Sequence, residues 1–236
     1  MKELSGEVFY PSKEVLKNSR VKDWDKLNDF ASKDLEGFWD KEAKELKWFS
    51  KWDKVLDDSF KPFYKWFTGG TTNIAYNCLD VHLKTHRKNK VALIWEGEKG
   101  ESRVFSYFAL HREVSKFANV LKSLGVVKGD RVTLYLGRVP ELLISMLACA
   151  RIGAIHSVVY GGFSVEALHE RLEDSHSKVL VTADGAYQRG KIVPLKAIAD
   201  EALLRAASVV SVLVIKRTGE PVNMEYGRDI LSLIHI

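Results

Sequence analysis

The chain has 236 residues, of which 46% are hydrophobic and 28% are charged, close to the average for soluble globular proteins. This composition excludes a mainly disordered chain, a collagen and a coiled coil. No apolar run approaches the ~18 residues that a membrane helix needs, and the first residues contain no signal-peptide core. Two cysteines cannot form a disulfide framework, so we expect a cytoplasmic protein of one or two domains.

The net charge of +5 is small, and acidic and basic residues are interspersed. It gives weak support for a nucleic-acid or membrane partner, and we expect neither. The densest basic segment is HLKTHRKNK, residues 82–90. It is interpreted as a solvated helix end, where cations suit the negative end of the helix dipole, with a polyanion site as the alternative.

Five of the six tryptophans lie within the first 66 residues. Residues 23–30 and 34–46 have the spacing of short amphipathic helices, and Asp34 is a candidate N-cap. Large aromatic side chains on short helices usually pack against a neighbouring domain. The segment is therefore predicted to be an N-terminal extension on the main body, or else a separate small helical domain.

From residue 91 onward, short apolar runs alternate with helical patterns. The predicted strands are residues 91–95, 103–106, 131–136, 154–160, 178–182 and 209–215, and the predicted helices are residues 107–124, 140–152, 165–174 and 194–207. Strands that alternate with helices imply crossover connections and a parallel sheet. We predict an α/β fold, a partial doubly wound parallel sheet with helices on both faces, preceded by a Trp-rich, mostly helical N-terminal extension.

Ligands of such sheets bind outside the carboxyl ends of the strands, and two loops at this edge are candidate binding loops. In the first, Tyr160 is followed by Gly161 and Gly162, directly before a helix that Ser164 can cap. Two glycines allow backbone N–H groups to approach an anion at a helix N-terminus. The same glycines also suit a tight strand-to-helix turn with no ligand, and both interpretations stay open.

The second loop, residues 183–191, nearly matches a Walker phosphate-binding loop. The stretch GAYQRGK has Ile192 where that motif needs a Ser or Thr hydroxyl for Mg²⁺, and Pro194 interrupts the expected helix. What remains is a cationic loop with Arg189 and Lys191. Cations there suit a phosphorylated ligand, although a merely solvated loop is the alternative.

Other motifs do not lead to a catalytic centre. His169 begins a zinc-binding pattern whose second histidine is replaced by Glu173, and no serine-hydrolase elbow occurs. Cys149 lies in an apolar helix and His156 in a buried-type strand, so both are predicted to be core residues. The sequence therefore identifies no catalytic residue and no metal ligand.

Three stretches carry a family resemblance: WFTGGTTNIAYNCLDVH (residues 66–82), residues 129–164 and LVTADGAYQRGK (residues 180–191). Together they resemble the acetyl-coenzyme A synthetases, acyl-adenylate-forming enzymes of the acyl-CoA synthetase and luciferase superfamily. The likeness runs from the region of Pro11 to about Asp229. It includes FWDKEAKELKWFSKWDKVLD (residues 38–57), which looks like the N-terminal extension of acetyl- and propionyl-type synthetases.

The resemblance implies an acetate–CoA ligase with ATP and CoA as substrates. Acetate and ATP would give acetyl-adenylate and pyrophosphate, and the CoA thiol would then attack the adenylate. The loop at residues 160–162 would lie beside CoA, and Gln188, Arg189 and Lys191 would meet its nucleotide part. Relatives commonly have arginine at the position of Gln188, so one contact to a phosphate is expected to be missing. Mg²⁺ is expected in the full-length enzyme, with its site outside this chain.

The resemblance also implies how the chain is divided. We expect the extension at residues 1–85, the first part of the AMP-binding domain at residues 86–230, and a tail unlike the family at residues 231–236. The chain is therefore expected to be an inactive N-terminal fragment. Cutting the sheet after residues 209–215 is expected to leave that strand as an unpaired, aggregation-prone edge.

Three alternatives remain at this stage. The chain could be a stand-alone module that binds CoA or another nucleotide. It could belong to a propionate–CoA ligase, since the two acids differ by one methylene, worth about 1–3 kcal/mol in a pocket. It could also bind nucleic acid through residues 82–90, although that segment lacks clustered Arg with aromatic residues. The sequence leaves the oligomeric state open.

Overall fold

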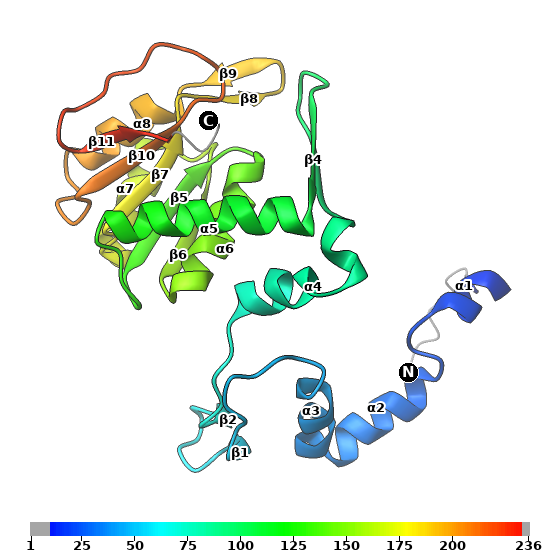
Figure 1. Ribbon diagram of the computed structural model, residues 1–236. Helices are drawn as coiled ribbons and strands as arrows, with labels where there is room; N and C mark the ends of the chain where they lie inside the picture. The colour runs from blue at the N-terminus through cyan, green and yellow to red at the C-terminus, as the bar shows by residue number, and fades with distance from the viewer. Residues whose placement is uncertain (1–9, 233–236) are drawn as a thin grey trace, which may run out of the picture. The chain divides into compact units, whose positions relative to one another are not determined.

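The structure is a computed structural model and describes residues 10–232. The chain forms two compact units, Met1–Thr71 and Thr72–Ile236, which are described separately (Figure 1). None of the helices within residues 10–232 combines the length and the apolar character that a membrane crossing requires.

The described part of the first unit contains short helices followed by a two-stranded hairpin. The elements are α1 (Lys13–Asn18), α2 (Trp24–Lys33), α3 (Leu35–Ala43), β1 (Lys54–Asp57) and β2 (Lys65–Thr68). Both predicted helices are present, although α2 runs to Lys33 and not to residue 30. Asp34 caps α3 as predicted, since its carboxylate accepts a hydrogen bond of 2.8 Å from the backbone N–H of Gly37. The prediction that this helix reaches residue 46 was wrong, since α3 ends at Ala43.

The antiparallel β1–β2 hairpin was not predicted, because four-residue strands are too short to show an alternating pattern. Aromatic rings pack beside it. The ring centroids of Trp48 and Trp52 lie 4.8 Å apart, and Phe67 lies 5.4 Å and 5.2 Å from them. Part of the tryptophan enrichment therefore forms a small aromatic core within this unit.

A five-stranded parallel sheet forms the centre of the second unit. Its strands are β5 (Arg131–Leu136), β6 (Ile155–Tyr160), β7 (Val179–Ala183), β10 (Ser211–Ile215) and β11 (Asp229–Leu231), in the order β11-β10-β7-β5-β6. Leu134 of β5 pairs with Val158 on one side and with Val181 on the other. The predicted α/β fold with a parallel sheet is confirmed.

Helices cover both faces of this sheet. They are α5 (Tyr107–Ser123), α6 (Pro140–Ile152), α7 (Val165–Ser175) and α8 (Leu195–Leu203). The chain moves outward from β5 to β6 and then crosses back past β5 to β7. Because such crossovers are right-handed, this reversal puts α6 on one face and α7 and α8 on the other, while α5 packs on α6 (Figure 1). The doubly wound arrangement is as predicted.

The helix boundaries follow from local signals in the sequence. Ser106 and Ser164 cap α5 and α7 through their side-chain oxygens. Gly153 ends α6 in the left-handed conformation, with φ of 76°, which suits glycine. The prediction for α8 was too long, because the helix ends at Leu203 instead of residue 207.

The edge of the sheet corrects one prediction. We expected β10 to be left unpaired, but β11 pairs with it in parallel, from Val212 opposite Asp229 to Val214 opposite Leu231. The buried Lys196 ammonium lies 2.8 Å from the Asp229 carboxylate and so ties β11 to α8. Of the predicted tail, residues 233–236 lie outside the described residues.

Short elements complete the unit. They are a π-helical turn η1 (Tyr76–Asp80), α4 (Val81–Leu83), a 3-10 helix η2 (His86–Asn89), and the antiparallel hairpins β3 (Val91–Glu96) with β4 (Ser102–Ser106) and β8 (Ala186–Gln188) with β9 (Lys191–Val193). The basic segment at residues 82–90 thus begins within the short helix α4 and includes η2, and its residues 84–90 are exposed. The β8–β9 hairpin falls where a loop was predicted, and the β3–β4 hairpin rises from the N-terminal end of α5 (Figure 1).

Candidate functional site

The carboxyl ends of β5, β6, β7 and β10 meet at one edge of the sheet, and the segments that follow them surround a cavity of about 520 Å³. We call it the rim cavity. Its lining comprises Trp95, Glu96, Gly97, Glu98, Gly137, Arg138, Val139, Tyr160, Gly161, Ala183, Gly185, Ala186, Tyr187, Gln188, Arg189 and Arg217. The cavity therefore lies where the order of the strands reverses, the usual ligand position in doubly wound sheets.

Four of the six predicted site residues line this cavity: Tyr160, Gly161, Gln188 and Arg189. The two predicted loops meet there through a hydrogen bond of 2.8 Å, which the Gln188 Nε2 donates to the Tyr160 hydroxyl. The other two predicted residues lie outside the lining: Gly162 follows Gly161 in the chain, and Lys191 pairs with Gln188 in the hairpin. Side chains that are 28 residues apart in the chain thus belong to one wall.

Gly161 allows the loop after β6 to lie close to the backbone at the end of β5. A Cβ atom at this position would lie 2.9 Å from the carbonyl oxygen of Leu136 and 3.2 Å from the backbone nitrogen of Gly137. Tyr135 also stabilises this loop, because its hydroxyl donates a 2.9 Å hydrogen bond to the carbonyl oxygen of Phe163. Packing against the end of β5 therefore accounts for this glycine, whether or not a ligand binds.

The second loop is a hairpin with an exposed cationic turn and not a Walker loop. Gln188 pairs with Lys191, and the two turn residues Arg189 and Gly190 have φ of 53° and 75°. The side chains of Arg189 and Lys191 are exposed. A turn of this kind presents two exposed cations, of which Arg189 lines the cavity, and such cations suit a phosphate group.

Asp184 organises the rim, and the sequence analysis did not identify it. This carboxylate, with 4% of its surface exposed, accepts backbone hydrogen bonds of 2.8 Å from Gly185, 2.7 Å from Arg217 and 2.9 Å from Thr218. Gly219 donates another, of 2.7 Å. Because these donors come from the ends of both β7 and β10, Asp184 ties two rim segments together. Its position directly after a buried strand is a signal that could have found it.

Arg217 is a second residue that sequence reasoning missed. Its guanidinium lies 5.1 Å from the ring centroid of Trp95 and 4.8 Å from that of Tyr187, and it forms an ion pair with Glu101. The pKa of the Glu101 carboxyl lies below its usual value, first because the backbone N–H of Glu101 donates a hydrogen bond to it, and second because the Arg217 guanidinium does so. The charge of Arg217 is thus partly satisfied within the protein, although its flat side chain forms part of the cavity wall.

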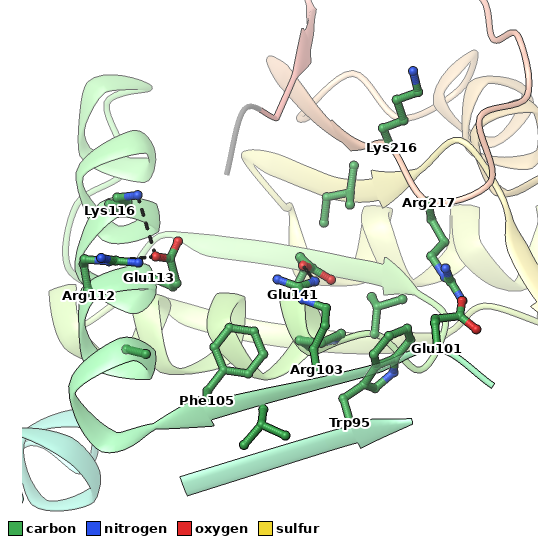
Figure 2. A pocket seen from close by; sticks show the side chains of 15 residues that line it. Trp95, Glu101, Arg103, Phe105, Arg112, Glu113, Lys116, Glu141, Lys216 and Arg217 are labelled. Atoms are coloured by element: carbon green, nitrogen blue, oxygen red, sulfur yellow. Dashed lines mark hydrogen bonds and ion pairs between the residues drawn. The ribbon is translucent and has the colours of Figure 1, made fainter. Parts of the chain in front are cut away.

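A second cavity of about 710 Å³, here the flank cavity, lies between β4, α5, the start of α6 and the end of β10. Trp95, Val139 and Arg217 line both cavities, so they form the shared wall. Figure 2 shows Glu113 joined to Arg112 and Lys116 on the side of α5. Arg112 and Lys116 thus share the single carboxylate of Glu113 in the wall of the flank cavity.

Cys149 and His156, which the sequence analysis placed in the core, do not line the rim cavity. Burial raises the pKa of the Cys149 thiol to about 12, so this cysteine is protonated at neutral pH, as expected of a core residue. Burial also lowers the pKa of the His156 imidazole, which lies half-buried on β6. Among residues 10–232, no group of three or more His, Cys, Asp and Glu side chains is arranged to hold a metal ion.

Two family models match adjoining parts of the chain. Residues 79–229 match the family described as AMP-binding enzyme, and residues 24–78 match the family described as acetyl-coenzyme A synthetase N-terminus. The first match contains every residue that lines the rim cavity.

Curated relatives agree with both matches. The chain is 51% identical over 211 residues to the acetyl-coenzyme A synthetase of Chlorobaculum tepidum, which covers 89% of this chain and 32% of that protein. It is 52% identical over 228 residues to the enzyme of the same name from Campylobacter jejuni, covering 94% and 35% of the two chains. The chain therefore spans about a third of the length of these relatives.

A solved structure supports the fold. The acetoacetyl-CoA synthetase from Streptomyces lividans has a TM-score of 0.80 to this chain at 24% sequence identity, covering 92% of this chain and 34% of that one. The family model that matches residues 79–229 covers more than half of the sequence. We conclude that this chain belongs to the AMP-binding enzyme family.

Proposed function

We propose that the chain is the N-terminal part of an acetate–CoA ligase. The complete enzyme would convert acetate, ATP and CoA into acetyl-CoA, AMP and pyrophosphate through acetyl-adenylate. The proposal is supported by the names of relatives about 50% identical over most of the chain, and by the match to the N-terminus of acetyl-coenzyme A synthetases. The finer division at residues 1–85, 86–230 and 231–236, and a cytoplasmic location, are parts of the same proposal.

In this proposal the rim cavity binds the nucleotide end of CoA, which carries a 3′-phosphate and a diphosphate. The observation that carries it is the meeting of the two predicted loops in one cavity, joined by the hydrogen bond from Gln188 to Tyr160. Arg189 and Lys191 would pair with phosphate oxygens, and the backbone at Gly161 and Gly162 would lie beside the ligand. Tyr187 also lines the cavity, and the cations of Lys99 and Arg217 lie over its ring.

Calorimetry with CoA and with 3′-dephospho-CoA tests this assignment. We expect the 236-residue chain to bind CoA more tightly than the dephosphorylated form, because one charge-assisted contact is lost. Arg189→Ala should weaken CoA binding about threefold to tenfold, which corresponds to one hydrogen bond of modest net strength. Lys88→Ala removes an exposed cation outside the cavity and should change the affinity less than about twofold. Equal effects of the two substitutions would contradict the assignment.

We further propose that this chain alone does not form acetyl-adenylate. That step requires preorganised charge around the ATP phosphates, and the family's Ser/Thr/Gly-rich phosphate loop does not occur in these 236 residues. Mg²⁺ enters only as a companion of ATP in the complete enzyme, with no ligand proposed here. Acetate-dependent exchange between ATP and pyrophosphate should therefore be absent, and measurable exchange would refute the proposal. CoA binding without exchange is also what a stand-alone CoA-binding module would give, so the downstream reading frame decides between them.

A further inference from the structure

The tip of the β3–β4 hairpin touches the cationic turn of the rim cavity. The backbone N–H of Gly190 donates a hydrogen bond to the Glu98 carboxylate, although the two residues are 92 positions apart. Gly190 stands between Arg189 and Lys191, the two cations proposed to bind phosphate. The protein thus holds one of its own anions at the position where the anion of a ligand is expected.

From this contact we propose that Glu98 acts as an internal stand-in for a ligand phosphate, so that a phosphate-bearing nucleotide must displace the hairpin tip in order to bind. The inference rests on the proposed function and adds to it a residue that sets affinity. A carboxylate and a phosphate oxygen compete for the same backbone donor and the same neighbouring positive charge. Glu98 would therefore lower the affinity of the rim cavity for its own ligand.

The hairpin is suited to such an exchange because polar and cation–π contacts hold its tip. The Lys99 ammonium lies 4.0 Å from the ring centroid of Tyr187, and the Trp95 indole N–H donates a 2.8 Å hydrogen bond to the carbonyl oxygen of Arg138. In contrast, Ile94 is 69% exposed and Val104 is 59% exposed. Since exposed polar contacts contribute about 0–1 kcal/mol each, a ligand phosphate can replace one of them.

The position of the hairpin also makes the exchange relevant to ligand access. Glu96, Gly97 and Glu98 all belong to the lining of the rim cavity, together with Gln188 and Arg189. Moving the tip away from Gly190 would open the cavity on that side, while the rest of the hairpin keeps its pairing from Trp95 opposite Arg103 to Glu96 opposite Ser102. Glu98 is exposed, so replacing it leaves the core intact.

Two measurements on the 236-residue chain test the proposal, with Glu98→Ala compared to Glu96→Ala. Both variants remove an exposed acid from the lining of one cavity, but only Glu98 contacts Gly190. The first measurement is hydrogen exchange of the Gly190 amide by NMR without ligand. We expect exchange at least about threefold faster in Glu98→Ala and unchanged in Glu96→Ala, because only the first loses an acceptor.

The second measurement is the Kd of adenosine 3′,5′-bisphosphate, a probe for the nucleotide end of CoA. We expect Glu98→Ala to bind about threefold to tenfold more tightly than the wild-type chain, and Glu96→Ala to change by less than about twofold. Equal gains in both variants would reduce the effect to net charge and overturn the stand-in role, as would an unchanged Gly190 exchange rate. If the wild-type chain and both variants fail to bind the probe, the proposed function itself is wrong and the inference falls with it.

Discussion

The central sheet and the rim hairpins of the second unit are built from similar residues but are stabilised differently. Leu134, Val181 and Leu213 of the sheet are fully buried, whereas Ile94 and Val104 of the β3–β4 hairpin are mostly exposed. Full burial of such a side chain contributes about 1.5–3 kcal/mol, but an exposed one contributes almost nothing. The sheet therefore supplies the stability of the unit, and the hairpins depend on a few polar contacts.

This difference explains where recognition can take place. A buried strand cannot rearrange without opening a cavity in a close-packed core, while a hairpin tip can exchange one polar contact for another. The β3–β4 and β8–β9 hairpins accordingly contribute mostly polar or aromatic side chains to the lining of the rim cavity, among them Glu96, Glu98 and Arg189. Four tests examine this division between a stable sheet and an adaptable rim.

The largest effect is expected from Leu134→Ala at the centre of the sheet. Removing this fully buried side chain should lower the free energy of unfolding by about 2–5 kcal/mol, because transfer free energy is lost and a cavity remains. Ile94→Ala in the exposed hairpin should cost less than about 0.5 kcal/mol. Urea unfolding followed by circular dichroism measures both, and comparable losses would show that the hairpin is part of the core.

Asp184→Asn tests the connection between the two regions. The amide of Asn would turn a donor toward backbone N–H groups that now reach a carboxylate, so we expect a loss of about 1.5–3 kcal/mol in the free energy of unfolding. CoA affinity should fall as well, because Arg217 and the segment after β10 lose their anchor. Asp174→Asn at an exposed position is the matched control and should leave both quantities unchanged.

Gln188→Arg should increase the affinity of the rim cavity for CoA without changing the stability of the sheet. The substitution breaks the 2.8 Å hydrogen bond to Tyr160 and adds a third cation beside Arg189 and Lys191. If phosphate binds there, CoA affinity should rise about threefold to tenfold, and the gain should shrink in high salt. Gln188→Met, which breaks the same hydrogen bond without adding charge, separates the two effects in calorimetry. Equal affinities of the two variants would speak against a phosphate at this position.

The smallest effect is expected at His156, a half-buried residue on the edge strand β6, and it concerns the pH dependence of the free energy of unfolding. Burial lowers the pKa of His156 in the folded chain, whereas an unfolded histidine titrates near about 6.5. Since the unfolded state then binds more protons at low pH, the contribution of His156 to stability should be constant above this value and fall as the pH drops below it. The urea midpoint at pH 5.5 should fall less, relative to pH 7.5, in His156→Gln than in the wild-type chain. An equal fall in both would show that other groups cause it.

Within the fold, the accuracy of prediction followed the strength of local signals. Residues 131–136 and 140–152 were predicted with the exact bounds of β5 and α6, because an apolar run, a Pro at the start of the helix and Gly153 at its end are local marks. The hairpins β1–β2 and β8–β9 were missed since three- and four-residue strands carry no clear period. The pairing of β11 with β10 was also missed, because it depends on backbone hydrogen bonds between distant segments and no local sequence pattern predicts it.

By itself, the sequence determined the alternation of strands and helices, the parallel sheet, and two candidate loops at its carboxyl edge, because hydrophobic period and capping residues act within a few positions along the chain. It also carried the family resemblance. Only the tertiary structure decided that Tyr160 and Gln188 share one wall, and that Asp184 and Arg217 complete the rim. It alone decided that Glu98 reaches Gly190. These contacts join segments from 28 to 92 residues apart, and such pairings depend on how the layers pack instead of on any local property of the chain.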